Sequence, residues 1–88
     1  MPPHGKILQF TVIDEIRRTQ SDAPNKMICL ELIRFDEDGR KELRLGYYIL
    51  GKLPTMRDRW VWGQYATFLP LKDFSAVVRQ ARRRGWIS

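Results

Sequence analysis

The sequence has little of the chemistry on which enzymes and metal sites depend. Its 88 residues include one cysteine, Cys29, and one histidine, His4, so neither an intramolecular disulfide nor a cysteine–histidine zinc site is expected. Cys29 stands among apolar residues of a predicted strand, where a buried thiol is inert. The glycines between residues 46 and 63 stand singly, without the spacing that cradles a phosphate. We therefore expect no enzymatic activity: no catalytic residue, cofactor, metal or small-molecule substrate.

Long apolar runs are also missing. No stretch approaches the ~20 apolar residues that a membrane-spanning helix needs. The first five residues, Met-Pro-Pro-His-Gly, lack the basic region and apolar stretch that are typical of a signal peptide. These absences predict a cytoplasmic protein with no membrane partner.

The composition is that of one small folded domain. Hydrophobic residues make up 43% of the chain and charged residues 30%, which is typical of a globular protein. A domain of this length buries only about two-thirds of the surface that its unfolded chain exposes, and dimerisation is a common source of further stability. We expect a flexible lead-in at residues 1–5, a single domain at residues 6–88, and a homodimer.

Four segments have the alternating apolar pattern of β-strands. In the first, Leu8, Phe10 and Val12 share one side. Turn-forming residues follow at positions 21–25, and Asp38-Gly39 supplies the backbone conformation of a tight hairpin. The predicted strands are Lys6–Thr19, Lys26–Phe35, Lys41–Leu50 and Trp60–Phe68.

From Leu71 onward the apolar period changes from two to about 3.6 residues, which indicates an amphipathic helix. Gly85 is expected to end this helix, and Trp86 to fold back on its last turn. The predicted fold is therefore α+β, an antiparallel four-stranded sheet followed by one C-terminal helix (ββββα). The side chains expected to pack the helix against the sheet or a partner are Phe74, Val77, Val78, Ala81 and Trp86.

Positive charge is in excess, with 16 Lys and Arg against 10 Asp and Glu, giving a net charge of +6. Such an excess favours a polyanionic partner, although it also suits simple solubility. Cations and aromatic rings are interleaved on the third strand, the following loop and the fourth strand, a combination that suits single-stranded nucleic acid. The predicted binding residues are Arg44, Tyr48, Lys52, Arg57, Arg59, Trp60 and Trp62.

These candidates have structural alternatives. Trp60 and Trp62 share a side with Ala66 and Phe68 that could equally pack on the helix. Aromatic residues at strand spacing more often lie in a core or a dimer contact than on a ligand platform. Arg44 and Tyr48 are stronger candidates, because the residues alternating with them are so apolar that they are expected to take the core side. The run Arg82–Arg84 is interpreted mainly as a solvated helix end that suits the helix dipole, rather than as a phosphate contact.

Two stretches carry a resemblance to a known family. The strand Leu-Arg-Leu-Gly-Tyr-Tyr at residues 43–48 follows a charged hairpin, and a helix opens with Leu-Pro-Leu-Lys-Asp-Phe at residues 69–74. This order resembles the single-stranded-DNA-binding transcriptional coactivators of the positive-cofactor-four type. The resemblance implies a homodimer with the helix as dimer surface. It also implies DNA binding through Arg44, Tyr48 and the loop cations Lys52, Arg57 and Arg59.

Two functions remain open on the sequence. The first is non-enzymatic binding of single-stranded nucleic acid, DNA favoured over RNA, with low sequence specificity and a role in transcription. The second is a small protein–protein interaction module or homodimeric subunit with no nucleic-acid role, since interfaces also enrich aromatic residues and arginine.

Overall fold

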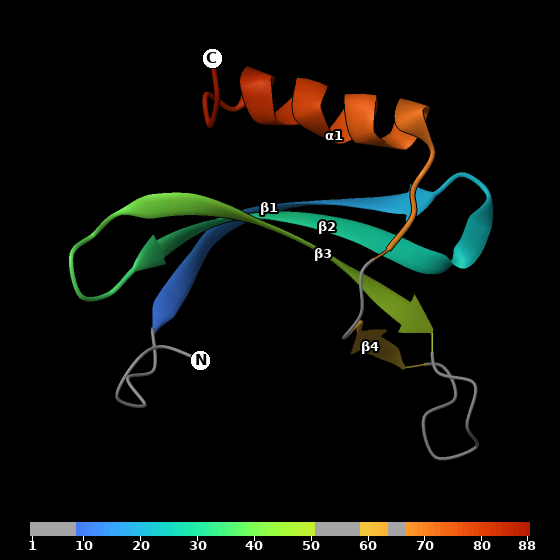
Figure 1. The fold of residues 1–88 in the computed structure, drawn as a ribbon, viewed down its shortest axis with the longest axis horizontal. Helices are drawn as coiled ribbons and strands as arrows, with labels where there is room; N and C mark the ends of the chain where they lie inside the picture. Colours follow the sequence, from blue (N-terminus) through green and yellow to red (C-terminus); the bar gives the residue numbers. More distant parts are fainter. Residues whose placement is uncertain (1–8, 51–58, 64–66) are drawn as a thin grey trace.

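A computed structural model describes residues 9–50, 59–63 and 67–88 of the chain. Four strands form one antiparallel sheet in the order β1-β2-β3-β4, and a single helix lies on one side of it (Figure 1). The predicted ββββα fold is confirmed. The elements are β1 (Phe10–Gln20), β2 (Ala23–Phe35), β3 (Lys41–Leu50), β4 (Trp60–Trp62) and α1 (Leu71–Arg83).

The predicted hairpin between β2 and β3 forms as its turn residues require. Gly39 adopts a φ of 74°, a conformation that glycine takes without steric cost. The Phe35 amide donates to the Arg40 carbonyl, and the Gly39 amide donates to the Phe35 carbonyl. β3 then runs from Lys41 to Leu50, as the alternation predicts.

Predicted boundaries of three strands differ from the structure. β1 runs from Phe10 to Gln20, so Gln9 lies outside it and its end is one residue later than predicted. β2 begins at Ala23 rather than Lys26, because Ala23 pairs with Gln20 and leaves only two residues for the turn. β4 ends at Trp62, and Thr67 and Phe68 lie outside any strand. There the chain leaves the sheet to reach α1, and Lys26 donates to the Phe68 carbonyl beside this crossing. The predicted strand residues 6–8 and 64–66 lie outside the described part of the chain.

The hydrophobic core lies between α1 and the adjacent side of the sheet. Val77 and Ala81 of α1 are 1% and 0% exposed and pack on Ile16, Ile28 and Leu30. Trp86 packs against the same cluster, together with Leu69 and Ile87. The predicted core role of Val77, Ala81 and Trp86 is confirmed.

The helix covers only part of this side of the sheet. It packs mainly on β1, so much of the helix-side surface of β3 is left exposed. Leu43 and Leu45 remain 42% and 45% exposed, whereas Tyr47 is buried. The expectation that all the apolar side chains of β3 lie in the core is therefore wrong. The prediction that Phe74 and Val78 pack α1 on the sheet is also wrong, because Phe74 is 48% exposed and neither residue belongs to the core cluster.

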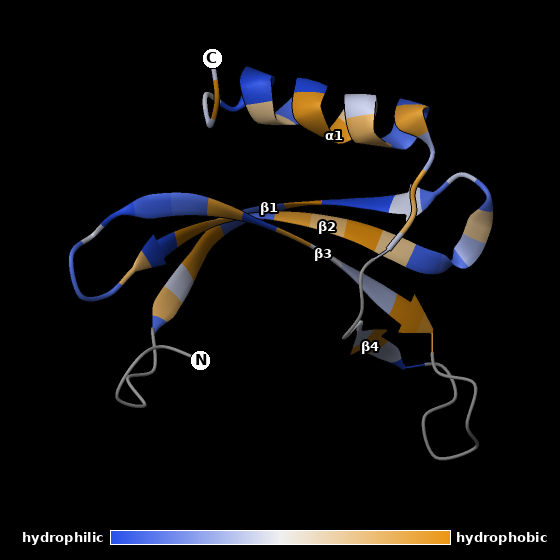
Figure 2. Cartoon of the chain, in the orientation of Figure 1, coloured by the Kyte–Doolittle hydropathy of each residue, from blue (hydrophilic) through white to orange (hydrophobic). Residues whose placement is uncertain are grey.

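The C-terminal end of α1 is closed by backbone hydrogen bonds. Gly85 has a φ of 76° and donates to the Arg82 carbonyl, while Trp86 donates to the Ala81 carbonyl. The predicted helix end at Gly85 and the return of Trp86 are confirmed. Figure 2 shows this end of α1 as hydrophilic, where the arginines lie, while hydrophobic positions recur along the rest of the helix.

Hydrogen bonds to Asp73 link the N-terminal end of α1 to the turn between β1 and β2. Its carboxylate, 0% exposed, accepts hydrogen bonds from the Ser21 hydroxyl at 2.6 Å and the Ser21 amide at 3.0 Å. Arg18 donates to it at 2.7 Å. The Ser21 hydroxyl, the Ser21 amide and Arg18 together lower the pKa of Asp73 to about 2.

We expect Asp73→Asn to lower the midpoint of thermal unfolding and to flatten its dependence on acid pH. Because the folded-state pKa lies below the ordinary value of 3.8, this carboxylate stabilises the fold fully above about pH 4 and loses that effect as pH falls towards 2. Thermal melts between pH 5 and 2 measure the difference, with the exposed Asp22→Asn as control. An unchanged pH slope in Asp73→Asn would contradict this linkage.

Candidate nucleic-acid interface

The sheet has a second side, facing away from α1 (Figure 1). Directly paired residues of antiparallel strands point to the same side, so the register identifies this surface. Glu15 pairs with Glu31 and Glu31 with Arg44, while Tyr48 pairs with Trp62. We call this surface the open face. Its principal residues are Phe10, Glu15, Arg17, Cys29, Glu31, Arg44, Tyr48, Trp60 and Trp62.

Arg44 is held at the centre of the open face by three groups. Its guanidinium carbon lies 4.8 Å from the centre of the Phe10 ring and 4.6 Å from that of the Trp62 ring. Its Nε donates to Glu31 Oε1 at 2.5 Å. The Glu31 residue is only 3% exposed, so this carboxylate is buried beneath the arginine that it binds. Arg44 is therefore fixed between two rings over a buried anion.

Arg17 and Tyr48 continue this arrangement. The Arg17 guanidinium lies 5.0 Å from the centre of the Tyr48 ring, and its Nε pairs with Glu15 at 2.9 Å. Tyr48 meets Trp62 edge to face, with centroids 5.0 Å apart. Burial raises the pKa of the Tyr48 phenol, so the ring stays neutral at physiological pH. The result is a ring–cation row, which consists of Phe10, Arg44, Trp62, Tyr48 and Arg17.

Two glycines set the close approach of β3 and β4. On the open face, the space where a Cβ of Gly46 would lie is filled by the indole of Trp62. On the helix side, the corresponding space at Gly63 is filled by the ring of Tyr47. The Gly63 amide also donates to the Tyr47 carbonyl at 2.7 Å. Trp62 therefore packs on Gly46 of β3, and Tyr47 of β3 packs on Gly63, directly after β4. These two contacts stabilise the position of β4, which is joined to β3 by only three residue pairs.

Glu15, Cys29 and Glu31 form a compact cluster beneath the row, with ligand atoms within 4.8 Å of one another. Each carboxylate is already paired, Glu15 with Arg17 and Glu31 with Arg44. Burial and the neighbouring carboxylates raise the pKa of the Cys29 thiol to about 11, and its Sγ lies 3.6 Å from Glu15 Oε2. The thiol is therefore protonated at neutral pH, and the cluster is best explained as the anionic support of two arginines.

The predicted binding residues are only partly brought together. Arg44, Tyr48 and Trp62 lie in the ring–cation row, and β-strand alternation places Trp60 on the same face at 39% exposure. Arg59, next to it, is exposed. Lys52 and Arg57 lie outside the described residues. Within the described residues, Trp60 and Trp62 lie on the side of the sheet away from α1 and outside the core cluster, while the alternative of a dimer contact stays open.

Sequence reasoning missed Phe10, Arg17 and Glu31. The alternation of β1 grouped Phe10 with the apolar side, but a β-bulge between Val12 and Asp14 shifts the register. After the bulge, Ile16 points into the core, whereas Phe10 lies against Arg44 on the open face. An irregular pairing of this kind leaves no signal in the sequence of one strand.

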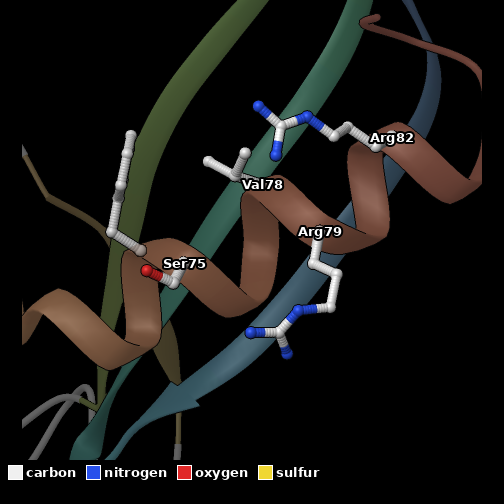
Figure 3. A pocket seen from close by; sticks show the side chains of 5 residues that line it. Ser75, Val78, Arg79 and Arg82 are labelled. Atoms are coloured by element: carbon white, nitrogen blue, oxygen red, sulfur yellow. The ribbon is translucent and has the colours of Figure 1, made fainter.

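The arginines at the end of α1 lie apart from this row. Arg84 donates to Asp14 and to the Glu15 carbonyl, and Arg82 donates to the Ser88 carbonyl. A pocket of about 310 Å³ lies along the helix, and all of its lining residues come from α1 (Figure 3). It is a groove on one helix, without polar groups from a second element. The lining residues are Phe74, Ser75, Val78, Arg79 and Arg82.

Comparisons with protein-family models, with curated proteins and with solved structures find no match to this chain. No residue role is therefore carried over from a relative. Within the described residues, α1 is the one helix, and it is too short and too polar to cross a membrane.

Proposed function

We propose that this protein binds single-stranded nucleic acid, with DNA preferred over RNA and with little sequence preference, on the open face of its sheet. The observation that carries the proposal is the ring–cation row, in which Arg44 and Arg17 lie over aromatic rings on the side away from α1. The resemblance to transcriptional coactivators makes transcription the process that we propose it serves.

The chemistry of the row suits a flexible polyanion. Aromatic faces stack on any base, which contributes about 1–3 kcal/mol per base without selecting a sequence. Trp60 is 39% exposed and Tyr48 is half-buried at the same edge of the sheet, so both offer ring surface to a base. Guanidinium groups beside the rings meet the phosphates that link stacked bases.

Attraction over longer distances must come from other cations, because Glu15 and Glu31 offset the charges of Arg17 and Arg44. The net charge of +6 supplies this attraction, and Arg59 lies exposed beside Trp60. We therefore expect binding that combines stacking on the open face with a salt-dependent contribution from surrounding cations.

The test is a titration of a fluorescently labelled 15-nucleotide oligothymidine, followed by anisotropy at several salt concentrations. Each phosphate contact contributes a slope of about −0.7 in a plot of log affinity against log salt, so three contacts weaken binding more than tenfold between about 50 and 200 mM. Tyr48→Ala should weaken binding about tenfold through lost stacking.

The matched control is Phe74→Ala, which removes a half-exposed ring from the opposite side of the molecule. Its affinity should equal that of the wild type. Absence of binding at about 50 mM salt, near the low end of the usual range, would reject the proposal in favour of a protein-interaction role.

The second candidate function is self-association through the helix side of β3. Leu43, Leu45 and Ile49 are 36–45% exposed there, and Phe74 of α1 is 48% exposed. An interface of standard size buries about 800 Å² per partner, about an eighth of the 6663 Å² surface of the chain. We propose a homodimer in which this apolar surface is covered by a second copy, leaving both open faces accessible.

Leu45→Glu should convert such a dimer into a monomer, because it places a charge at the centre of the covered surface. Sedimentation equilibrium measures the mass directly. Val12→Glu makes the same change at an exposed apolar residue of β1 and should leave the dimer intact. A wild-type protein that sediments as a monomer throughout would contradict this candidate.

A further inference from the structure

The contacts of Arg44 restrict its side chain before any ligand arrives. The Phe10 and Trp62 rings lie within 5 Å of its guanidinium carbon, and Glu31 accepts a hydrogen bond from its Nε. Within the described residues, its two terminal nitrogens have no partner. The side chain is 39% exposed, although the carboxylate under it is only 4% exposed. The guanidinium is thus oriented from three directions and reachable from the fourth.

Trp62 restricts the position of the Arg44 guanidinium. One part of its indole fills the space above Gly46, and Arg44 lies over the ring. Both contacts reduce the ring surface that a base could stack upon. Trp60 lies two residues earlier on the same face; no described residue covers it in this way, and at 39% exposure it is the more accessible ring.

We propose that Arg44 is a pre-oriented phosphate contact and that Glu31 is its positioning residue. This inference rests on the proposed function, because it assigns a role within the same open face. A planar guanidinium offers two parallel N–H donors to a pair of phosphate oxygens, and Glu31 leaves its terminal nitrogens available for them. Because folding has already ordered the side chain, binding loses less side-chain entropy.

Removal of the Glu31 charge should change the affinity for nucleic acid in the direction opposite to that expected from net charge alone. Glu31 is an anion at the binding surface, so on charge alone its removal should strengthen the attraction of phosphate. If Glu31 positions Arg44, its removal should weaken binding although the surface becomes more positive. The sign of the change therefore separates the two views.

The experiment compares Glu31→Gln with Glu42→Gln, using the 15-nucleotide oligothymidine at constant salt. Glu42 lies on β3, two residues before Arg44 and on the same face, and its partner is Arg40 rather than Arg44. Both variants lose one negative charge. We expect Glu31→Gln to bind about tenfold more weakly, as for a lost charge-assisted contact, and Glu42→Gln to bind as tightly as the wild type or slightly more tightly. Thymine lacks the paired acceptors that arginine recognises on guanine, so the probe reports phosphate contacts.

A buried carboxylate is a sensitive position, so thermal melts must accompany the titrations. If Glu31→Gln does not fold, Arg44→Lys decides the question. Lysine keeps the charge beside Glu31 but has neither the plane nor the paired donors, so it should bind about tenfold more weakly with an unchanged salt slope.

Three results would overturn the inference: equal affinities of Glu31→Gln and Glu42→Gln, tighter binding by Glu31→Gln, or wild-type affinity of Arg44→Lys. Any of these with a wild type that binds rejects the positioning role and leaves the proposed function standing. A wild-type protein that does not bind oligothymidine rejects the proposed function itself.

Discussion

Arg44→Glu is expected to weaken binding of the 15-nucleotide oligothymidine by about 100-fold, or about 2.7 kcal/mol. The change removes the guanidinium at the centre of the ring–cation row and places a carboxylate beside Glu31, which already lies opposite Glu15. Phosphate approaching this surface would then meet three carboxylates. The salt slope should fall as well, because one phosphate contact is lost.

The control for this variant is Arg79→Glu, which makes the same charge change on the outer surface of α1. Both variants reduce the net charge from +6 to +4, since each replaces +1 by −1. Arg79→Glu should weaken binding of the oligothymidine only slightly, through the lower net charge. Equal losses in the two variants would mean that binding follows overall charge and has no location on the open face.

Folding must be separated from binding at position 44. Three neighbouring carboxylates repel one another, and Arg44→Glu is therefore expected to lower the melting temperature as well. Arg44→Gln removes the cation without adding an anion. If Arg44→Gln melts near the wild type and still binds at least tenfold more weakly, the loss belongs to the contact with nucleic acid rather than to unfolding.

The parts of the fold that the sequence predicts are those set by local chemistry. Asp38-Gly39 specifies a tight turn, and the change of period at Leu71 marks the start of α1. Gly85 ends the helix because only a residue that tolerates a positive φ closes it in this way. In each case the information lies within a few neighbouring residues, so one sequence is enough.

Features that depend on distant partners are not predictable in this way. The alternation of β3 predicts a core side but not which strand the helix covers, and α1 lies over β1. The role of Asp73 depends on Ser21, which lies 52 residues earlier in the chain. In the same way, the bulge in β1 brings Phe10 to the open face through its pairing with β2.

The candidate site contains both predictable and unpredictable features. Arg44 and Tyr48 are placed on the side away from the helix by alternation with apolar neighbours, and the structure confirms that side. What alternation cannot give is the support of Arg44 by Glu31, which comes from a neighbouring strand. The ring that covers Gly46 comes from β4, sixteen residues later in the chain, so this glycine appears isolated in the sequence.

Gly46→Ala is expected to destabilise the fold by about 1–3 kcal/mol, as for other substitutions that overpack a filled site. A methyl group at this position would occupy the space that the Trp62 indole now fills. Trp62 would have to move away from β3, and its contacts with Tyr48 and Arg44 would be lost with that movement. Denaturant unfolding measures the loss, and weaker binding of oligothymidine should accompany it.

A double-mutant cycle with Trp62→Ala tests whether the indole is the cause. Without the indole, the three atoms nearest to the added methyl group are gone, and alanine is favoured over glycine within a strand by about 0.5–1 kcal/mol. Gly46→Ala should therefore be neutral or slightly stabilising in the Trp62→Ala background, giving a coupling energy of about 1–3 kcal/mol. An equal cost in both backgrounds would show that the methyl group meets something other than Trp62. In that case, the packing of Trp62 on Gly46 would not be the contact that positions β4 and the Trp62 ring beside Arg44.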